Sequence, residues 1–169
     1  IDLPNIVALE EYIAATSKGG CLAYGVTGGC DANMIVDAFH VEIDTWYNFV
    51  PANSTQDPTS QNHIAVTLDG NPSEHKLWAA IPTIEDQQWH TVDVDISGNF
   101  VSVKLEGSVI IEGEIDGLNF RGGYIGFSGS TGHAYNWHRI DNLSVDQECL
   151  LPSTAVSYTH LRAHETFGY

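Results

Sequence analysis

Two acidic residues, Glu42 and Asp44, alternate with apolar ones in the segment Val41-Glu-Ile-Asp-Thr-Trp-Tyr-Asn48. In an extended strand, Glu42, Asp44 and Trp46 point to one face and Ile43 points to the other. Two adjacent carboxylates repel each other unless a proton or a cation lies between them. The pair is therefore either a catalytic dyad or half of a metal site.

The segment after this strand adds further metal ligands. Asp57 offers a third carboxylate, and His63 offers an imidazole just before the next apolar run. Hard Ca²⁺ prefers oxygen ligands, whereas an ion such as Mn²⁺ also accepts imidazole nitrogen, so the sequence predicts two adjacent cations. The predicted calcium set is Asp44, Asn48, Asp57 and the Trp46 carbonyl, and the predicted manganese set is Glu42, Asp44, Asp57 and His63.

Strand-like patterns must position these ligands. Val92, Val94 and Ile96 alternate with polar residues, which is typical of a strand buried on one face, and Asp69-Gly70 is one of several turn signals between such runs. A short helix is expected near residues 6–13. The expected strands are residues 35–46, 63–68, 76–81, 89–96, 100–105, 109–114, 124–128 and 140–145. Eight short strands predict an all-β, antiparallel, two-sheet sandwich of the jelly-roll type.

Composition limits the classes of partner. The chain has 169 residues, enough for one domain, and a net charge of -16 from 22 acidic and 6 basic residues. This charge argues against binding to nucleic acid or to anionic membranes, because both rely on Lys and Arg. No apolar run is long enough for membrane insertion. Of three cysteines, Cys21 and Cys30 are the best local pair, and the pattern leaves open whether they are bonded.

The two ends of the chain have separate expectations. Residues 1–150 are predicted to form the domain, and residues 151–169 are predicted to be a non-native or disordered tail. Residues 156–166 resemble the translation of a transposase adapter from sequencing libraries, so residues 156–169 are excluded from the predicted fold. His160 and His164 are therefore not assigned to a metal site.

The motifs together resemble a known family. Val41-Glu-Ile-Asp-Thr-Trp-Tyr-Asn48, Asp57-Pro58 and Asn62-His-Ile-Ala-Val66 are similar to the metal-binding core of L-type (legume-type, concanavalin A-like) lectins, especially non-plant members. The stretches Phe127-Ser-Gly-Ser-Thr-Gly132 and Trp137 to Val145 resemble the family's specificity loop and closing strand. The resemblance implies a non-catalytic, calcium-dependent glycan-binding domain with calcium and manganese sites.

The resemblance also implies which residues contact a glycan. Asn48 would bond sugar hydroxyls, Trp46 would stack on a pyranose ring, and Gly20 would contribute a backbone N–H. Tyr135 and Asn136 would select the sugar. The family's sugar-binding Asp-Gly pair has no counterpart before Gly19, so we expect the domain to be truncated at its N-terminus.

Two other functions remain open. Jelly-roll glucanases need a second glutamate on the acidic strand, where this chain has Trp46 and Tyr47. A laminin-G-like adhesion or structural module would fit the strand pattern near Trp89. The expected partners are glycans or glycoconjugates, at the cell surface or outside the cell, in a possible homo-oligomer or larger multidomain chain. The histidines left as structural are His40, His75, His90 and His138, and the tryptophans assigned to the core or to sheet faces are Trp78, Trp89 and Trp137.

Overall fold

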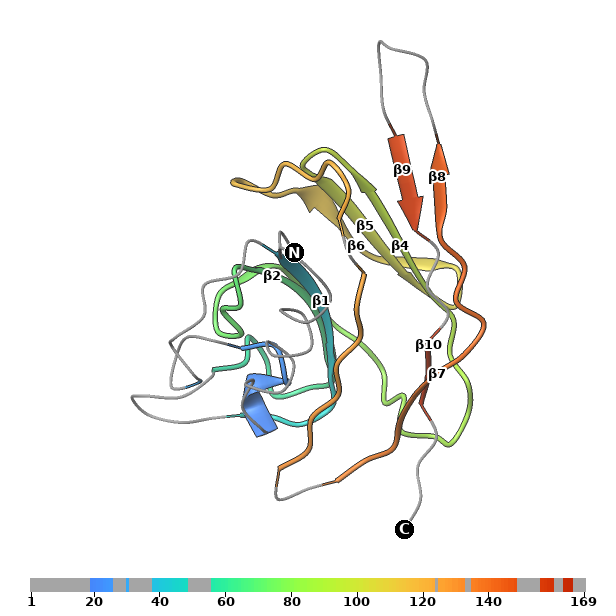
Figure 1. Ribbon diagram of the computed structural model, residues 1–169. Coiled ribbons are helices and arrows are strands. Elements are labelled where there is room, and N and C mark those ends of the chain that lie inside the picture. Colours follow the sequence, from blue (N-terminus) through green and yellow to red (C-terminus); the bar gives the residue numbers. More distant parts are fainter. Residues whose placement is uncertain are drawn as a thin grey trace, which may run out of the picture. The chain divides into compact units, whose positions relative to one another are not determined.

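The computed structural model describes residues 19–25, 30, 38–48, 56–123, 125–132, 135–148, 156–159 and 163–165. The chain divides into two compact units (Figure 1). The first comprises Ile1–Ala80 and Gly123–Tyr135, and the second comprises Ile81–Gly122 and Asn136–Tyr169. The helix expected at residues 6–13 lies outside the described residues.

The first unit is a three-stranded antiparallel sheet with a short 3-10 turn, η1 (Gly19–Cys21). Its strands are β1 (Phe39–Asp44), β2 (His63–Leu68) and β3 (His75–Ala80), in the order β1-β2-β3. Ile64, Ala65 and Val66 of the central strand are fully buried. Both faces of β2 are therefore covered, which explains its apolar run Ile64-Ala65-Val66.

The second unit contains a five-stranded antiparallel sheet in the order β6-β5-β4-β9-β8. Its strands are β4 (Val92–Ser97), β5 (Phe100–Leu105), β6 (Ser108–Glu114), β8 (Asp146–Glu148) and β9 (Val156–Thr159). The two-residue turn Glu106-Gly107 joins β5 to β6 with φ of 51° and 73°. Positive φ at both positions matches the turn type that follows the natural twist of a hairpin, and glycine meets that demand without strain. A separate pair joins β7 (His138–Ile140) to β10 (Ala163–Glu165).

The predicted all-β, antiparallel class is confirmed, and the strands predicted at residues 63–68 and 100–105 have the observed bounds. The jelly-roll packing stays a prediction. Two predicted strands are wrong: residues 125–128 have no strand, and residues 141–145 form the break between β7 and β8. Of the two places predicted for the tryptophans, the core is wrong, because Trp78, Trp89 and Trp137 are each more than two-fifths exposed; Trp78 lies on an exposed sheet face, in β3.

The tail differs from its prediction as well. Residues 156–159 form β9, which pairs with β4 on one side and β8 on the other, and residues 163–165 form β10 against β7. Excluding these residues from the fold therefore disagrees with the structure, while their resemblance to an adapter sequence stays a prediction. Within the described part of the chain, no helix has the length and apolar character needed to cross a membrane.

Candidate metal centre

The register of β1 and β2 gathers acidic residues on one face of the first unit's sheet. Asp44 lies directly opposite His63, and Glu42 lies opposite Ala65. Side chains alternate between faces along a strand, so Glu42 and Asp44 share the face that His63 occupies. Glu42 is 5%, Asp44 4% and His63 1% exposed. Buried charges at this density require compensation by partners or by a cation.

Glu42 sits at the centre of a polar network. Its Oε2 accepts a hydrogen bond from the Tyr24 hydroxyl, whose oxygen accepts one from Thr67 Oγ1 at 3.0 Å. Its Oε1 faces two imidazoles, at 3.5 Å from His63 Nε2 and 2.9 Å from His75 Nε2. Burial favours a raised pKa, but interactions with His63, His75 and Tyr24 outweigh it and lower the pKa of Glu42 to about 2. Glu42 is therefore an ionised carboxylate.

The carboxylates of Asp44 and Asp57 bind the backbone of residues 46–48, which follow β1. Asp44 Oδ1 accepts a hydrogen bond from the Trp46 N–H at 2.7 Å, and Asp57 Oδ2 accepts one from the Asn48 N–H. The Asp57 N–H in turn donates to the Asn48 carbonyl at 3.3 Å. These bonds fix the backbone of residues 46–48 against both carboxylates.

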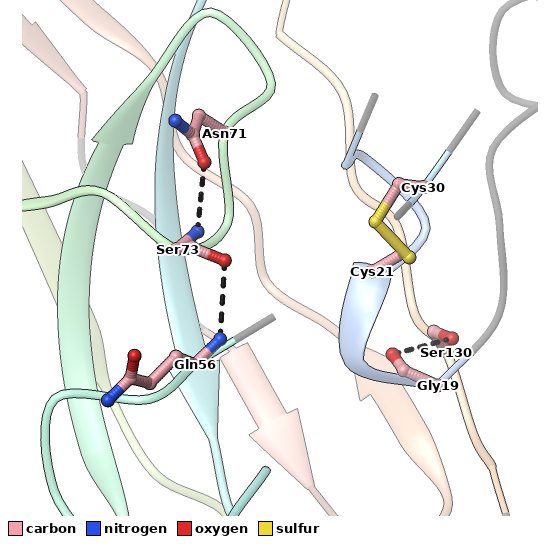
Figure 2. The surroundings of a disulfide bond; sticks show 7 residues. All are labelled: Gly19, Cys21, Cys30, Gln56, Asn71, Ser73 and Ser130. Atoms are coloured by element: carbon pink, nitrogen blue, oxygen red, sulfur yellow. Dashed lines mark hydrogen bonds between the residues drawn. A yellow bond between two sulfur atoms is a disulfide. The ribbon is translucent and has the colours of Figure 1, made fainter. Parts of the chain in front are cut away.

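The loop that carries Asp57 is tied to the turn between β2 and β3. The Gln56 N–H donates to Ser73 Oγ at 3.2 Å, and the Ser73 N–H donates to Asn71 Oδ1 at 3.1 Å (Figure 2). Asp57 itself is 8% exposed. Its carboxylate is thus placed by the turn as well as by Asn48.

The electrostatics of the two aspartates favour a bound cation. Burial, opposed by the Trp46 N–H and reinforced by the charge of Asp57, raises the pKa of Asp44 to about 6. Burial also raises the pKa of Asp57 against the effect of the Asn48 N–H. Burial therefore makes the charged form of both carboxylates costly, and a divalent ion would remove that cost.

One buried carboxylate oxygen lacks a partner, and two buried imidazole nitrogens face a carboxylate. Asp44 Oδ2 has no hydrogen-bond partner among the described residues, whereas His63 Nε2 and His75 Nε2 lie 3.5 Å and 2.9 Å from Glu42 Oε1. His63 Nδ1 lies 3.2 Å from the Gln61 carbonyl oxygen, which can only accept, so a neutral His63 carries its proton on Nδ1 and keeps a free lone pair on Nε2. A buried polar atom without a partner, as Asp44 Oδ2 is here, is rare and calls for an explanation such as an ion.

The ligand atoms fall into two groups that share His63. One group is Glu42, His63 and His75, and the other is Asp44, Asp57 and His63; within each group the ligand atoms all lie within 4.8 Å of one another. The oxygen-rich group fits a hard divalent ion, and the group with two imidazoles fits a borderline transition ion. Both groups are of a composition that could hold a metal ion, and the predicted calcium and manganese ions stay predictions.

The structure brings together four of the predicted ligands: Glu42, Asp44, Asp57 and His63. For Asn48 and Trp46 it records backbone N–H bonds to the aspartates, and their roles as calcium ligands stay predictions. The structure also places His75, which the sequence analysis left as structural, beside Glu42 and His63, so it is a further candidate ligand. His40 stacks on Tyr24 with ring centroids 4.1 Å apart, and Tyr24 in turn donates a hydrogen bond to Glu42.

A β-bulge explains why the sequence did not reveal His75. Leu77 lies opposite Val66, but the register shifts between Val66 and Thr67, so His75 lies opposite Thr67. Simple alternation along β3 places His75 on the face of Leu77, whereas the bulge places it on the face of Thr67 and His63. The available signal was a histidine close to the Asp69-Gly70 turn, which does not by itself predict a bulge.

The segment around η1 places Tyr24 over this face. Cys21 and Cys30, the best pair in the sequence, are joined by a disulfide (Figure 2). Ser130 Oγ donates to the Gly19 carbonyl at 3.3 Å, and Ser128 Oγ donates to the Leu22 carbonyl at 3.1 Å. The loop that resembles a lectin specificity loop therefore contacts η1.

The predicted glycan-contacting residues differ in exposure. Trp46 is 59% exposed and Tyr135 is 76% exposed, while Gly20 in η1 is half-buried. Tyr135 belongs to the first unit and Asn136 to the second. Their contacts with a glycan stay predictions.

Comparison with protein-family models, with curated proteins and with solved structures finds no match for this chain.

Proposed function

We propose that this chain is a non-catalytic, calcium-dependent carbohydrate-binding domain. One observation carries the proposal: the chain passes directly from a buried group of metal-ligand type, Asp44 with Asp57 and His63, into the exposed ring of Trp46. A ligand-binding surface next to a metal-ligand cluster is the arrangement expected when an ion organises a shallow recognition site.

The supporting geometry is the backbone clamp. The N–H groups of Trp46 and Asn48 are bonded to the carboxylates of Asp44 and Asp57. A bound calcium ion would neutralise the two carboxylates, and the candidate ligands for it are Asp44, Asn48, Asp57 and the Trp46 carbonyl. With the aspartates held, the segment that bears the indole and the amide is held too.

The chemistry of these side chains suits a sugar. An indole presents an apolar face to the C–H face of a pyranose, and a fixed amide offers both a donor and an acceptor to hydroxyls. Trp46 and Asn48 provide that pair at neighbouring positions. Binding at such an exposed site is modest in affinity, so a second site or a second copy would strengthen attachment.

The experiment is a glycan array probed with the purified chain in calcium and again after chelation. We expect sugar binding in calcium and its loss in chelator. Asp44→Asn should lose both calcium binding and sugar binding, whereas Trp46→Ala should keep calcium-induced thermal stabilisation and lose sugar binding, because only its backbone contacts Asp44.

Asp69→Asn is the matched control. Asp69 is exposed and has a φ of 55°, a conformation that Asn tolerates, and its N–H bonds the Ala38 carbonyl. It removes one carboxylate outside the cluster and should leave sugar binding unchanged. Silence of the wild-type chain on the array in both conditions would overturn the proposal.

A further inference from the structure

We infer that Glu42, His63 and His75 form a separate two-histidine, one-carboxylate site for a borderline transition ion of the Zn²⁺ class. The site differs from the predicted manganese set, because His75 joins it and the two aspartates do not belong to it. It stands independently of the proposed sugar binding.

Burial and spacing support a built site. The side chains of His63, His75 and Glu42 are 1%, 6% and 3% exposed. Zinc ligands at about 2.1 Å from a tetrahedral ion lie about 3.4 Å from one another. The distance of 3.5 Å between His63 Nε2 and Glu42 Oε1 matches that edge, and the 2.9 Å from His75 Nε2 to the same oxygen needs only a small outward shift.

The surrounding contacts orient the three ligands. The Gln61 carbonyl is placed to hold the His63 ring with Nε2 directed inward, and the Tyr24 hydroxyl, itself bonded by Thr67, engages the Glu42 oxygen that does not face the imidazoles. Outer contacts of this kind are what metal-binding histidines and carboxylates characteristically possess. Both Nε2 atoms face the same oxygen, Glu42 Oε1, so the three candidate ligand atoms converge on one point.

His63 belongs to both groups of candidate ligands, and its coordination decides which ligands remain for a second ion. His63 has one free nitrogen, so it can coordinate one ion and not one in each group. When His63 joins Glu42 and His75, the remaining ligands are the oxygens of Asp44 and Asp57. Nitrogen-rich ligands favour Zn²⁺ or Co²⁺, and an all-oxygen set favours Ca²⁺, so ligand type separates the two ions.

Calorimetric titration of the chelator-treated chain with Zn²⁺, together with the visible spectrum of bound Co²⁺, tests the inference. We expect one Zn²⁺ per chain, and a loss of at least about tenfold in Zn²⁺ affinity for His75→Ala. His75→Gln is the second variant, because its amide can still bond Glu42 and preserve the fold; it should lose Zn²⁺ to the same extent. His90→Gln, in the second unit, is the histidine control and should bind Zn²⁺ as the wild type does.

Asp44→Asn distinguishes this site from the aspartate site. It should keep Zn²⁺ affinity within about threefold while losing Ca²⁺. The inference is overturned if folded His75→Gln binds Zn²⁺ as tightly as the wild type, or if Asp44→Asn loses Zn²⁺ in parallel with Ca²⁺. A wild-type chain that binds Zn²⁺ through His75 but no sugar would reject the proposed function alone.

Discussion

Asp44 is a candidate metal ligand whose buried charge also destabilises the metal-free protein. It is buried, one of its oxygens has no hydrogen-bond partner among the described residues, and burial raises its pKa from 3.8 to about 6. A carboxyl whose pKa is raised in the folded state disfavours folding once it is ionised. Under the proposed function, Asp44 serves to bind the calcium ion and lowers the stability of the metal-free fold.

Asp44→Asn should therefore stabilise the metal-free protein at pH 8. The raised pKa corresponds to a gain on the order of 2–3 kcal/mol in the free energy of unfolding, because the amide needs no ionisation and can still accept the Trp46 N–H. Urea unfolding of the chelator-treated wild type and variant measures the gain. Saturating calcium should reverse the order, since it stabilises only the wild type.

The pH dependence of that gap is a further check on the sign. Above about pH 6 the Asp44 penalty is fully present; as pH falls from 6 toward 3.8 the folded carboxyl binds its proton before the unfolded one, and the penalty disappears. The difference between variant and wild type should therefore shrink on acidification through this range. A gap that stays constant from pH 8 to pH 4 would contradict the assignment to Asp44.

At the scale of elements, the strand pattern predicted most of the site. Strict alternation in residues 41–48 put Glu42 and Asp44 on one face, and the structure pairs that face with His63. The sequence did not indicate that His75 shares this face, because a bulge changes which face His75 of β3 occupies. Bulges depend on sheet geometry rather than on residue pattern. The strand predicted at residues 124–128 failed because its apolar residues, such as Ile125 and Phe127, are not buried against a partner strand.

The segment around η1 also depends on close packing at one glycine. A Cβ atom on Gly25 would lie 2.9 Å from the Cys21 carbonyl oxygen, 2.9 Å from Pro72 Cγ and 3.0 Å from Cys30 Sγ. Gly25→Ala should destabilise the protein by about 1–3 kcal/mol, because backbone and disulfide must move to admit the methyl group. Thermal unfolding of the chelator-treated variant measures the loss.

Gly126→Ala is the matched control for Gly25→Ala. A Cβ at Gly126 meets nothing within 4 Å, so its substitution should be close to neutral. The displacement in Gly25→Ala should also reach Tyr24, the adjacent residue, and so weaken Zn²⁺ binding through Glu42. Equal melting temperatures for the two variants would contradict this prediction, because they would show that the segment around η1 admits the methyl group without loss of stability.

At the scale of the whole molecule, the acidity of the chain bears on the proposed metal binding. The chain carries a net charge of -16, and three buried carboxylates of the first unit, Glu42, Asp44 and Asp57, converge on two candidate cation sites. Excess negative charge disfavours the compact state by self-repulsion, and bound divalent ions offset it locally. Composition alone indicated the excess, but only the strand register located the carboxylates that bear on an ion.

The division into two units predicts where metal binding stabilises the chain. Every ligand of both candidate sites belongs to the first unit, whereas β4, β5 and β6 belong to the second. Because an ion that binds the folded state stabilises the part that holds its ligands, calcium and zinc should slow amide hydrogen exchange in β1, β2 and β3 by about tenfold or more and leave β4 to β6 nearly unchanged. Hydrogen exchange read by mass spectrometry measures this, with Asp44→Asn in calcium as the unresponsive control. Equal protection of β4 to β6 would instead mean that the two units open together as one cooperative structure.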